Sequence, residues 1–148
     1  MTSGNTIRLD FHSSLEVLDF VQAVSDHIGR MAGLDEDSVH WVGVAVRESV
    51  INAIKHGNCG DPGKRVHVEF TAIGDTARAA IAIRVRDQGC GFDPSLLADP
   101  LAPENLLKGS GRGILLMRSF MDEMTFARSP EGGTEVRMVK RINQPTVA

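Results

Sequence analysis

Four polar side chains interrupt an apolar stretch in the first half of the chain. At about 100° per residue they share one arc of a helix, and they are Glu48, Asn52, Lys55 and His56. Apolar residues of the same stretch fall on the opposite arc, namely Val39, Val42, Val46, Val50, Ala53 and Ile54. Such a polar stripe usually faces water. An acid and an amide one turn apart could also bind a charged ligand, so the helix alone leaves both interpretations open.

Two glycine-rich segments in the second half of the chain are candidates for contact with a ligand. Asp87 ends a strand-like run and is followed by Gly89 and Gly91, a spacing that lets a ligand approach the backbone closely. A helical pattern later in the chain is preceded by Gly109, Gly111 and Gly113. Backbone N–H groups and the helix dipole favour phosphate at such a helix start. Taken alone, each segment could be a turn or a hinge.

Two other phosphate-binding motifs do not fit the sequence. A P-loop requires a first glycine and a hydroxyl residue after its lysine, and residues 61–65 lack both. A dinucleotide-binding fingerprint requires a glycine at the position of Ile114 and a place in the first βα turn of a parallel sheet. The glycine segments therefore belong to neither of these classes of nucleotide-binding fold.

The composition is typical of one soluble globular domain. The chain has 148 residues, of which 42% are apolar and 24% charged. Its formal net charge of −3 and its lack of a Lys/Arg cluster argue against direct binding to nucleic acid. No apolar stretch approaches the roughly 18 residues of a transmembrane helix, and the first residues carry no export signal. We therefore expect a cytoplasmic protein without membrane contact.

The cysteines and histidines predict neither a disulfide scaffold nor a structural metal site. The two cysteines, Cys59 and Cys90, are too few for a disulfide framework and suit a reducing cytosol. The five histidines show no ligand spacing with one another or with cysteine, which argues against structural zinc.

Local patterns predict the elements that must position these residues. Strands are expected over residues 6–11, 65–73, 78–87, 124–129 and 133–142. A first helix is expected to be capped by Ser13 or Ser14 and to end at Gly33. Its core positions are Leu15, Leu18, Val21, Val24 and Ile28. Residues 35–38 supply caps for a long second helix that continues through His56.

The order of these elements, with a further helix after the second glycine segment, predicts an α+β fold. We expect a two-layer sandwich in which helices cover one face of a mixed, largely antiparallel sheet. A single domain over residues 1–148, with its core over about residues 6–142, accounts for the chain. Residues 94–108 contain several prolines and lie between the glycine segments, so we expect them to form a lid over the ligand.

Taken in order, the segments form a more specific pattern. E-x-x-x-N-A-x-x-H-G lies on a helix, D-x-G-x-G follows a strand, G-x-G-x-G precedes a helix, and a Gly-Thr pair opens the final strand. This pattern resembles the GHKL (Bergerat-fold) ATPase superfamily. Within it, the chain is most similar to the small anti-sigma-factor serine/threonine kinases of bacteria. The resemblance extends over about residues 6–142 and implies ATP and Mg²⁺ as cofactors.

The resemblance implies a chemical role for four residues. Asn52 matches the asparagine that coordinates Mg²⁺, which takes few protein ligands beside phosphates and water. Glu48 matches the general base that deprotonates an incoming hydroxyl. Asp87 matches the aspartate that accepts a hydrogen bond from the exocyclic amine of adenine, and Thr134 matches the threonine that supports adenine through water.

Further residues match the family with alternatives left open. Lys55 matches a lysine that contacts phosphate, but it could also cap the carbonyls of a helix end. His56 belongs to the family's His-Gly pair and either lines the nucleotide site or packs at the helix terminus. The glycines expected to approach the nucleotide are Gly89, Gly91, Gly109, Gly111 and Gly113, the last three around its phosphates. Arg112 adds charge to the phosphates or to a partner, or faces solvent.

The resemblance also implies the function. The protein is expected to phosphorylate a serine or threonine of an anti-sigma-factor antagonist and to sequester a sigma factor. The resemblance leaves a homodimer open. One alternative is a nucleotide-gated switch that binds its partner without phosphorylating it, although such a binder needs no base at Glu48. Another is a detached histidine-kinase catalytic domain, which usually carries asparagine at that position.

Overall fold

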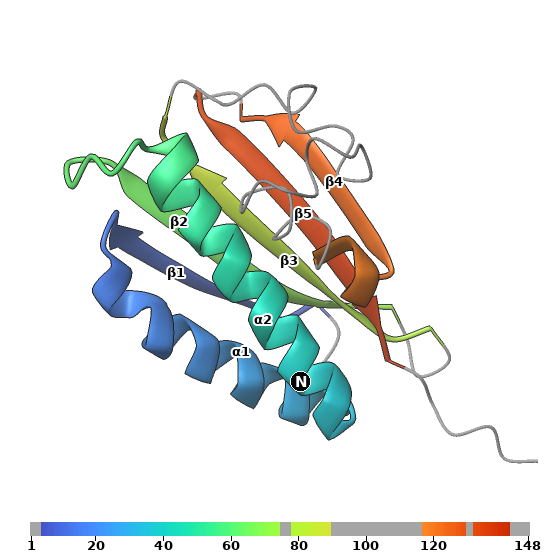
Figure 1. Ribbon diagram of the computed structural model, residues 1–148. Coiled ribbons are helices and arrows are strands. Elements are labelled where there is room, and N and C mark those ends of the chain that lie inside the picture. Colours follow the sequence, from blue (N-terminus) through green and yellow to red (C-terminus); the bar gives the residue numbers. More distant parts are fainter. Residues whose placement is uncertain (1–3, 75–77, 90–116, 130–131, 143–148) are drawn as a thin grey trace, which may run out of the picture.

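The computed structural model describes residues 4–74, 78–89, 117–129 and 132–142. Within them, five strands form one sheet in the order β1-β2-β3-β5-β4, and two long helices cover one of its faces (Figure 1). The elements are β1 (Thr6–His12), the 3-10 helix η1 (Leu15–Val17), α1 (Leu18–Ala32), α2 (Glu36–Asn52), the π-helical turn η2 (Ala53–Gly57), β2 (Arg65–Ile73), β3 (Ala80–Asp87), β4 (Glu123–Arg128) and β5 (Thr134–Arg141). The prediction of a two-layer α+β sandwich is confirmed, and every strand pairing described is antiparallel.

The first helical segment begins and ends at the predicted residues. Ser14 accepts a hydrogen bond from the Glu16 N–H at the start of η1. Gly33, at φ +97°, ends α1 in the left-handed conformation that glycine adopts readily. The prediction that Leu15 faces the core is wrong, because its side chain is 50% exposed. The first turn is a 3-10 helix, whose angular spacing differs from that of the α-helix that was assumed.

The second helix changes type near its C-terminal end. Asp35 caps α2 by accepting the Ser38 N–H at 2.7 Å. The prediction of an α-helix through His56 is wrong in its last turn, because α2 ends at Asn52 and η2 follows. There the Asn58 N–H donates to the Ala53 carbonyl at 2.8 Å, an i to i+5 bond that makes the turn wider than an α-helical one.

Each predicted strand exists, with bounds within two residues of those predicted. Side chains alternate along β2, so that Val66, Val68 and Phe70 are buried on the face turned toward the helices. The register places Asp87 opposite Val66 of β2, and Arg86 opposite Glu135 of β5. The end of β3 and the start of β5 therefore lie at the same end of the sheet.

The core lies between the helices and the inner face of the sheet. The six residues predicted on the apolar arc of the second helix are all buried: Val39, Val42, Val46, Val50, Ala53 and Ile54. The outer face carries exposed or half-buried ion pairs instead, such as Arg8 with Glu69 at 3.1 Å and Arg84 with Glu135 at 3.6 Å. Such pairs contribute little to stability, so apolar burial beneath the helices holds the layers together.

Two predictions concern parts of the chain that lie wholly or partly outside the described residues. The expected lid, residues 94–108, lies outside the described residues. The helix expected after the second glycine segment is described over residues 117–120, which are helical. Among the described residues, no helix is long and apolar enough to cross a membrane.

Candidate functional site

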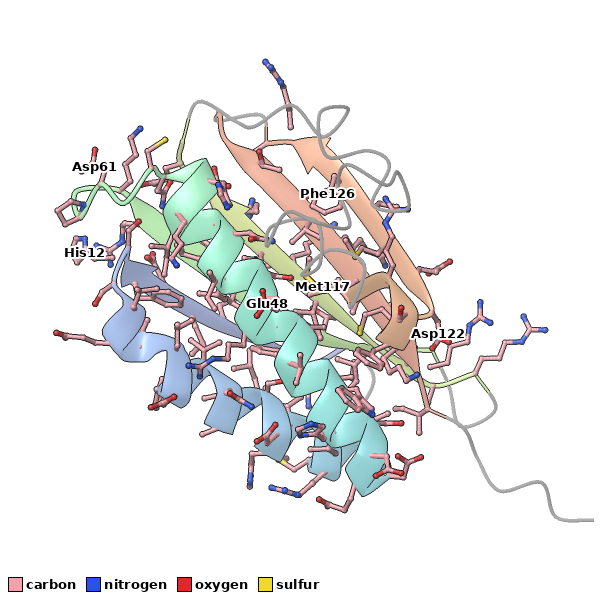
Figure 2. The ribbon with its side chains drawn as sticks, in the orientation of Figure 1. His12, Glu48, Asp61, Met117, Asp122 and Phe126 are labelled. Atoms are coloured by element: carbon pink, nitrogen blue, oxygen red, sulfur yellow. The ribbon has the colours of Figure 1, made fainter. Side chains whose placement is uncertain are left out.

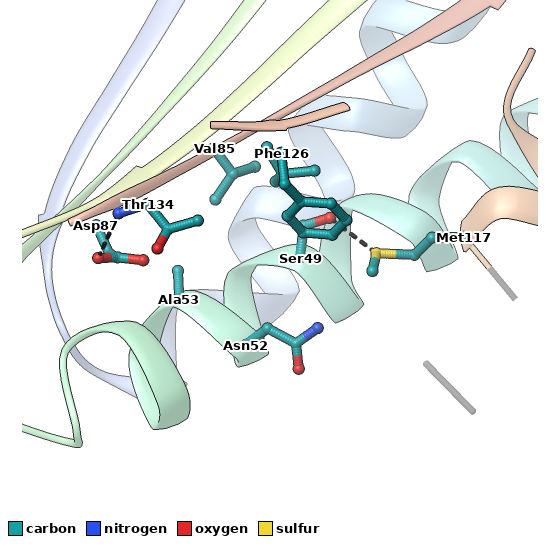
Figure 3. Close-up of a pocket in the computed structure, with 9 residues that line it drawn as sticks. Ser49, Asn52, Ala53, Val85, Asp87, Met117, Phe126 and Thr134 are labelled. Carbon is teal, nitrogen blue, oxygen red and sulfur yellow. Dashed lines mark hydrogen bonds between the residues drawn. The ribbon is translucent and has the colours of Figure 1, made fainter. Parts of the chain in front are cut away.

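A cavity lies between α2 and the sheet, at the end of β3 (Figure 3). The space between its lining atoms is about 260 Å³, including the part that is open to solvent. Nine of the described residues line it: Ser49, Asn52, Ala53, Val85, Asp87, Met117, Phe126, Thr134 and Val136. Figure 3 shows Asp87 beside Thr134 at one end and Met117 at the other. An apolar cavity with a few polar groups is typical of sites for planar organic ligands.

Asp87 is a buried acid whose two oxygens have different roles. Asp87 is the last residue of β3 and is 4% exposed. Oδ1 accepts hydrogen bonds from the Gly89 N–H at 3.0 Å and the Thr134 N–H at 3.1 Å. Burial raises the pKa of Asp87, and these two hydrogen bonds oppose that shift. Oδ1 is thus held by the backbone, while Oδ2 accepts no hydrogen bond from any described residue.

Three glycines surround Asp87 and leave no room for side chains. A Cβ on Gly57 would overlap Asp87 Oδ2, and a Cβ on Gly133 would overlap the Asp87 carbonyl. A Cβ on Gly89 would overlap the Gly57 carbonyl, so the turn after β3 packs directly on η2. Glycine is required at these positions because backbone and carboxylate approach at contact distance. The contact with Asp87 therefore explains why the His-Gly pair of the sequence motif has glycine at Gly57.

Two hydroxyl groups lie inside the cavity. Thr134 Oγ1 is buried and has no hydrogen-bond partner among the described residues. Ser49 Oγ donates to the Ala45 carbonyl at 2.9 Å and lies 3.0 Å from Met117 Sδ. A buried hydroxyl without a partner is costly, and a ligand or a water beside Asp87 would satisfy Thr134.

Asn52 and Glu48 lie one turn apart on the last turns of α2. Asn52 is half-buried and lines the cavity. Glu48 is also half-buried, one turn before the end of α2 (Figure 2), and its carboxylate has no hydrogen bond or ion pair with any described residue. The helix therefore presents an amide at the cavity and, one turn earlier, a carboxylate without a partner among the described residues. Their roles with a nucleotide stay predictions.

The remaining predicted residues fall into three groups. Lys55 and His56 are exposed on η2, and neither lines the cavity, because the wide π-helical turn does not continue the arc of Glu48 and Asn52. Gly89 is buried against η2, as described above. The predicted residues outside the described part of the chain are Gly91, Gly109, Gly111, Arg112 and Gly113.

The side chains near Asn52 fit a magnesium ion that arrives with a nucleotide. Mg²⁺ usually takes one or two oxygens from protein and the rest from phosphates and water. Asn52 offers one amide oxygen at the cavity. Within the described ranges, no group of three His, Cys, Asp or Glu side chains forms a ready-made cage. A magnesium ion here would need the phosphates to complete its coordination.

Sequence reasoning missed several residues of the site. Ser49, Met117 and Phe126 line the cavity without having been predicted there. Ser49 carried a usable signal, because it is a polar residue on the core-facing arc of a helix. Met117 and Phe126 carried none, since apolar residues in a helix and a strand are ordinarily assigned to the core.

The sequence model of the histidine kinase-like ATPase domain matches residues 11–140. The chain belongs to this family. Membership in it makes this an ATP-binding domain and confirms the resemblance to the GHKL superfamily. Among similar proteins is the anti-sigma F factor of Oceanobacillus iheyensis, 33% identical over 112 residues that cover 73% of each chain.

Other relatives cover nearly the whole ATPase domain. The anti-sigma F factor of Clostridium perfringens strain 13 is 33% identical over 144 residues, 94% of this chain and 98% of that one. The serine-protein kinase RsbW of Staphylococcus epidermidis is 28% identical over 148 residues, 95% of this chain and 89% of that one. The names of these relatives agree with the anti-sigma kinase subgroup that the motifs predict.

A solved structure shares the fold. The crystal structure of the RsbU and RsbW domains of a Mycobacterium tuberculosis protein matches with a TM-score of 0.67 and 18% identity. The match covers 95% of this chain and 33% of that chain, so this ATPase domain spans about a third of the solved chain. At this identity the likeness shows the sandwich fold.

Proposed function

We propose that this protein is an ATP-dependent serine/threonine kinase that acts as an anti-sigma factor. The observation that carries the proposal is the cavity with Asp87 at its buried end and Asn52 on the last turn of α2, one turn after the free Glu48. The relatives named anti-sigma F factor and serine-protein kinase support the same activity. Only a site for both a nucleotide base and a reacting phosphate requires all three residues together.

In the proposed complex, adenine occupies the buried end of the cavity. Its exocyclic amine donates to Oδ2 of Asp87, which receives no hydrogen bond from the described residues. Thr134 Oγ1, buried without a partner, bonds to a water that bridges to the base. Guanine presents a carbonyl where adenine has the amine, and a carboxylate has no proton to offer it. The site therefore prefers ATP to GTP.

The phosphates then extend toward Asn52 and Glu48. Asn52 would hold Mg²⁺, which when bound neutralises charge on the transferring phosphoryl group. Glu48 takes the proton of the substrate hydroxyl. The hydroxyl oxygen bonds to the γ-phosphorus while the bond between that phosphorus and the bridging oxygen of ADP breaks. A carboxylate without an ion pair to the described residues suits this role, because no cation competes for its negative charge.

The glycine segments complete the proposed phosphate site. Backbone N–H groups at Gly109, Gly111 and Gly113 would bind the phosphates at the start of the helix that includes residues 117–120. Gly91 would pass close to the nucleotide as Gly89 passes close to η2. Long side chains supply further positive charge: Lys55 from η2, with His56 beside it, and Arg112 from the second glycine segment.

The proposed protein partners follow from the relatives. We propose an antagonist protein as the substrate that carries the serine or threonine, and a sigma factor as the partner that is sequestered. Both reactions place the protein in the cytoplasm, where ATP and sigma factors are available. A homodimer is compatible with this proposal and is not required by the site.

The experiment that tests the proposal compares the parent protein with Glu48→Gln. Each is incubated with Mg²⁺, γ-labelled ATP and a lysate of the source organism, and labelled phosphoserine or phosphothreonine proteins are quantified. We expect transfer by Glu48→Gln to fall by at least ~10²-fold, the usual contribution of a general base, with ATP affinity by calorimetry unchanged. Glu123→Gln, which changes an exposed acid of β4 away from the cavity, is the matched control.

Each outcome of this experiment has a clear meaning. Equal labelling by the parent and Glu48→Gln contradicts the role of Glu48 as the base. ATP binding without any labelled protein from the parent favours the nucleotide-gated switch over the kinase. Label on histidine in place of serine or threonine favours a histidine-kinase catalytic domain.

A further inference from the structure

Asn58, directly after η2, is a fully buried polar residue that joins three parts of the fold. It is 0% exposed. Its Nδ2 donates to Ser13 Oγ at 2.7 Å and to the Arg65 carbonyl at 3.0 Å, and its Oδ1 accepts the Gln88 N–H at 2.8 Å. One amide thus connects the segment after β1, the first residue of β2 and the turn after β3.

The hydrogen-bonding capacity of Asn58 is used on all sides. The residue's own N–H closes the π-helical turn on the Ala53 carbonyl at 2.8 Å, and its carbonyl accepts the Asp61 N–H at 3.0 Å. Ser13 Oγ, which accepts from Asn58, donates in turn to the Lys64 carbonyl at 3.0 Å. Buried amides in such networks fix geometry, because each lost bond leaves a polar group without a partner.

This network acts on the turn that carries Asp87. Gln88, whose N–H bonds to Asn58, lies between Asp87 and Gly89 in the chain. Gly89 packs with its Cα on the Gly57 carbonyl, one residue before Asn58. The distance between η2 and the end of β3 is therefore set by the Asn58 amide on one side and by glycine contacts on the other.

We infer that Asn58 is a positioning residue for recognition of the nucleotide base. By holding Gln88 against η2, it keeps Oδ2 of Asp87 at the place where the base amine must donate. This inference rests on the proposed function, because it assigns the selectivity of that same site to a residue outside the cavity. Recognition by one acceptor tolerates displacements of only about 0.5 Å, so movement of the turn weakens the preference for adenine.

The test measures base selectivity in Asn58→Ala, a variant that leaves every cavity residue in place. Dissociation constants for ATP and GTP are determined by calorimetry, and amide exchange of Gln88 is followed without nucleotide. We expect the ratio of ATP to GTP affinity to fall about tenfold and exchange at Gln88 to accelerate. Val139→Ala is the matched control for lost stability, because Val139 is buried on the other face of the sheet toward the far end of β5.

Ser13→Ala provides a milder second variant if Asn58→Ala does not fold. It removes one acceptor of the Asn58 amide and leaves the other two hydrogen bonds, so the ratio should fall in the same direction by a smaller factor. A folded variant that keeps the parental ratio overturns the inference, as does an equal fall in Val139→Ala. If the parent itself does not prefer ATP, base recognition in the proposed function is what fails.

Discussion

One carboxylate oxygen of Asp87 accepts hydrogen bonds from the backbone, and the other is proposed to accept one from a ligand in the cavity. Oδ1 takes two backbone N–H groups, from the turn after β3 and from the first residue of β5. Burial raises the pKa of this carboxyl, an effect common where a protein positions an acid for a ligand. The orientation of the side chain is therefore fixed before any nucleotide binds, which reduces the entropy that binding must overcome.

Asp87→Asn should weaken the preference for adenine. The amide oxygen must take the place of Oδ1, because the NH₂ group cannot accept the Gly89 and Thr134 N–H groups. The NH₂ group then occupies the position of Oδ2 and donates to the carbonyl of guanine. We expect the ratio of ATP to GTP affinity, measured by calorimetry, to fall at least ~10²-fold, with the melting temperature nearly unchanged. An unchanged ratio would show that Asp87 does not read the base.

At the scale of elements, the π-helical turn η2 organises the nucleotide end of the sandwich. Because the turn is wider than an α-helical one, Gly57 reaches the Asp87 carboxylate and Asn58 reaches the start of β2. The same widening leaves Lys55 and His56 exposed beyond the cavity. A π-helical turn is uncommon and often lies at a functional site. Here it continues the helix that carries Glu48 and packs against Asp87 at the end of β3.

Gly57→Ala should damage both stability and nucleotide binding. The added Cβ would overlap the Asp87 carboxylate, which is held on its other side by two backbone hydrogen bonds. We expect a loss of roughly 1–3 kcal/mol in the free energy of unfolding, as for an overpacked core, and at least tenfold weaker ATP binding by calorimetry. Gly63→Ala is the control. A Cβ at this exposed turn would lie 3.2 Å from Asp61 Oδ1, which is the end of an exposed side chain and can move aside. Equal ATP affinity in both variants would contradict the packing described here.

The sequence predicted the elements whose causes are local. The alternation of Val66, Val68 and Phe70 marks β2, and the capping residues Asp35 and Gly33 mark helix ends, because these signals act within a few residues. The π-helical turn could not be predicted in this way. Asn58, which closes this turn, is hydrogen-bonded to residues far along the chain, and local periodicity cannot predict such contacts.

The same distinction applies to the candidate site. The spacing of Glu48 and Asn52 predicted their common face, which the structure has. The environment of Asp87 could not be read from its neighbours, because its partner Thr134 lies 47 residues away in the chain. Family resemblance assigned each of the two residues to the adenine as an expectation, and strand register between β3 and β5 explains why the two meet.

At the scale of the whole molecule, the cavity is formed where the helical layer and the sheet meet the segment before β4. Trp41 of α2 stacks on Phe120, with ring centroids 4.0 Å apart and planes 12° apart. This contact fixes residues 117–120 against the helical layer, and Met117 of that segment lines the cavity. Residues 117–120 are therefore anchored to α2, the helix that carries Glu48 and Asn52.

The central claim is that ATP binds with its base at Asp87 and its phosphates toward Asn52 and Glu48. The most direct test is a crystal structure with Mg²⁺ and a non-hydrolysable ATP analogue. The account predicts the exocyclic amine about 3 Å from Asp87 Oδ2, a metal ion on the Asn52 amide oxygen, and the terminal phosphate on the side of Glu48. A base bound elsewhere, or a nucleotide with its phosphates at Asp87, would contradict it.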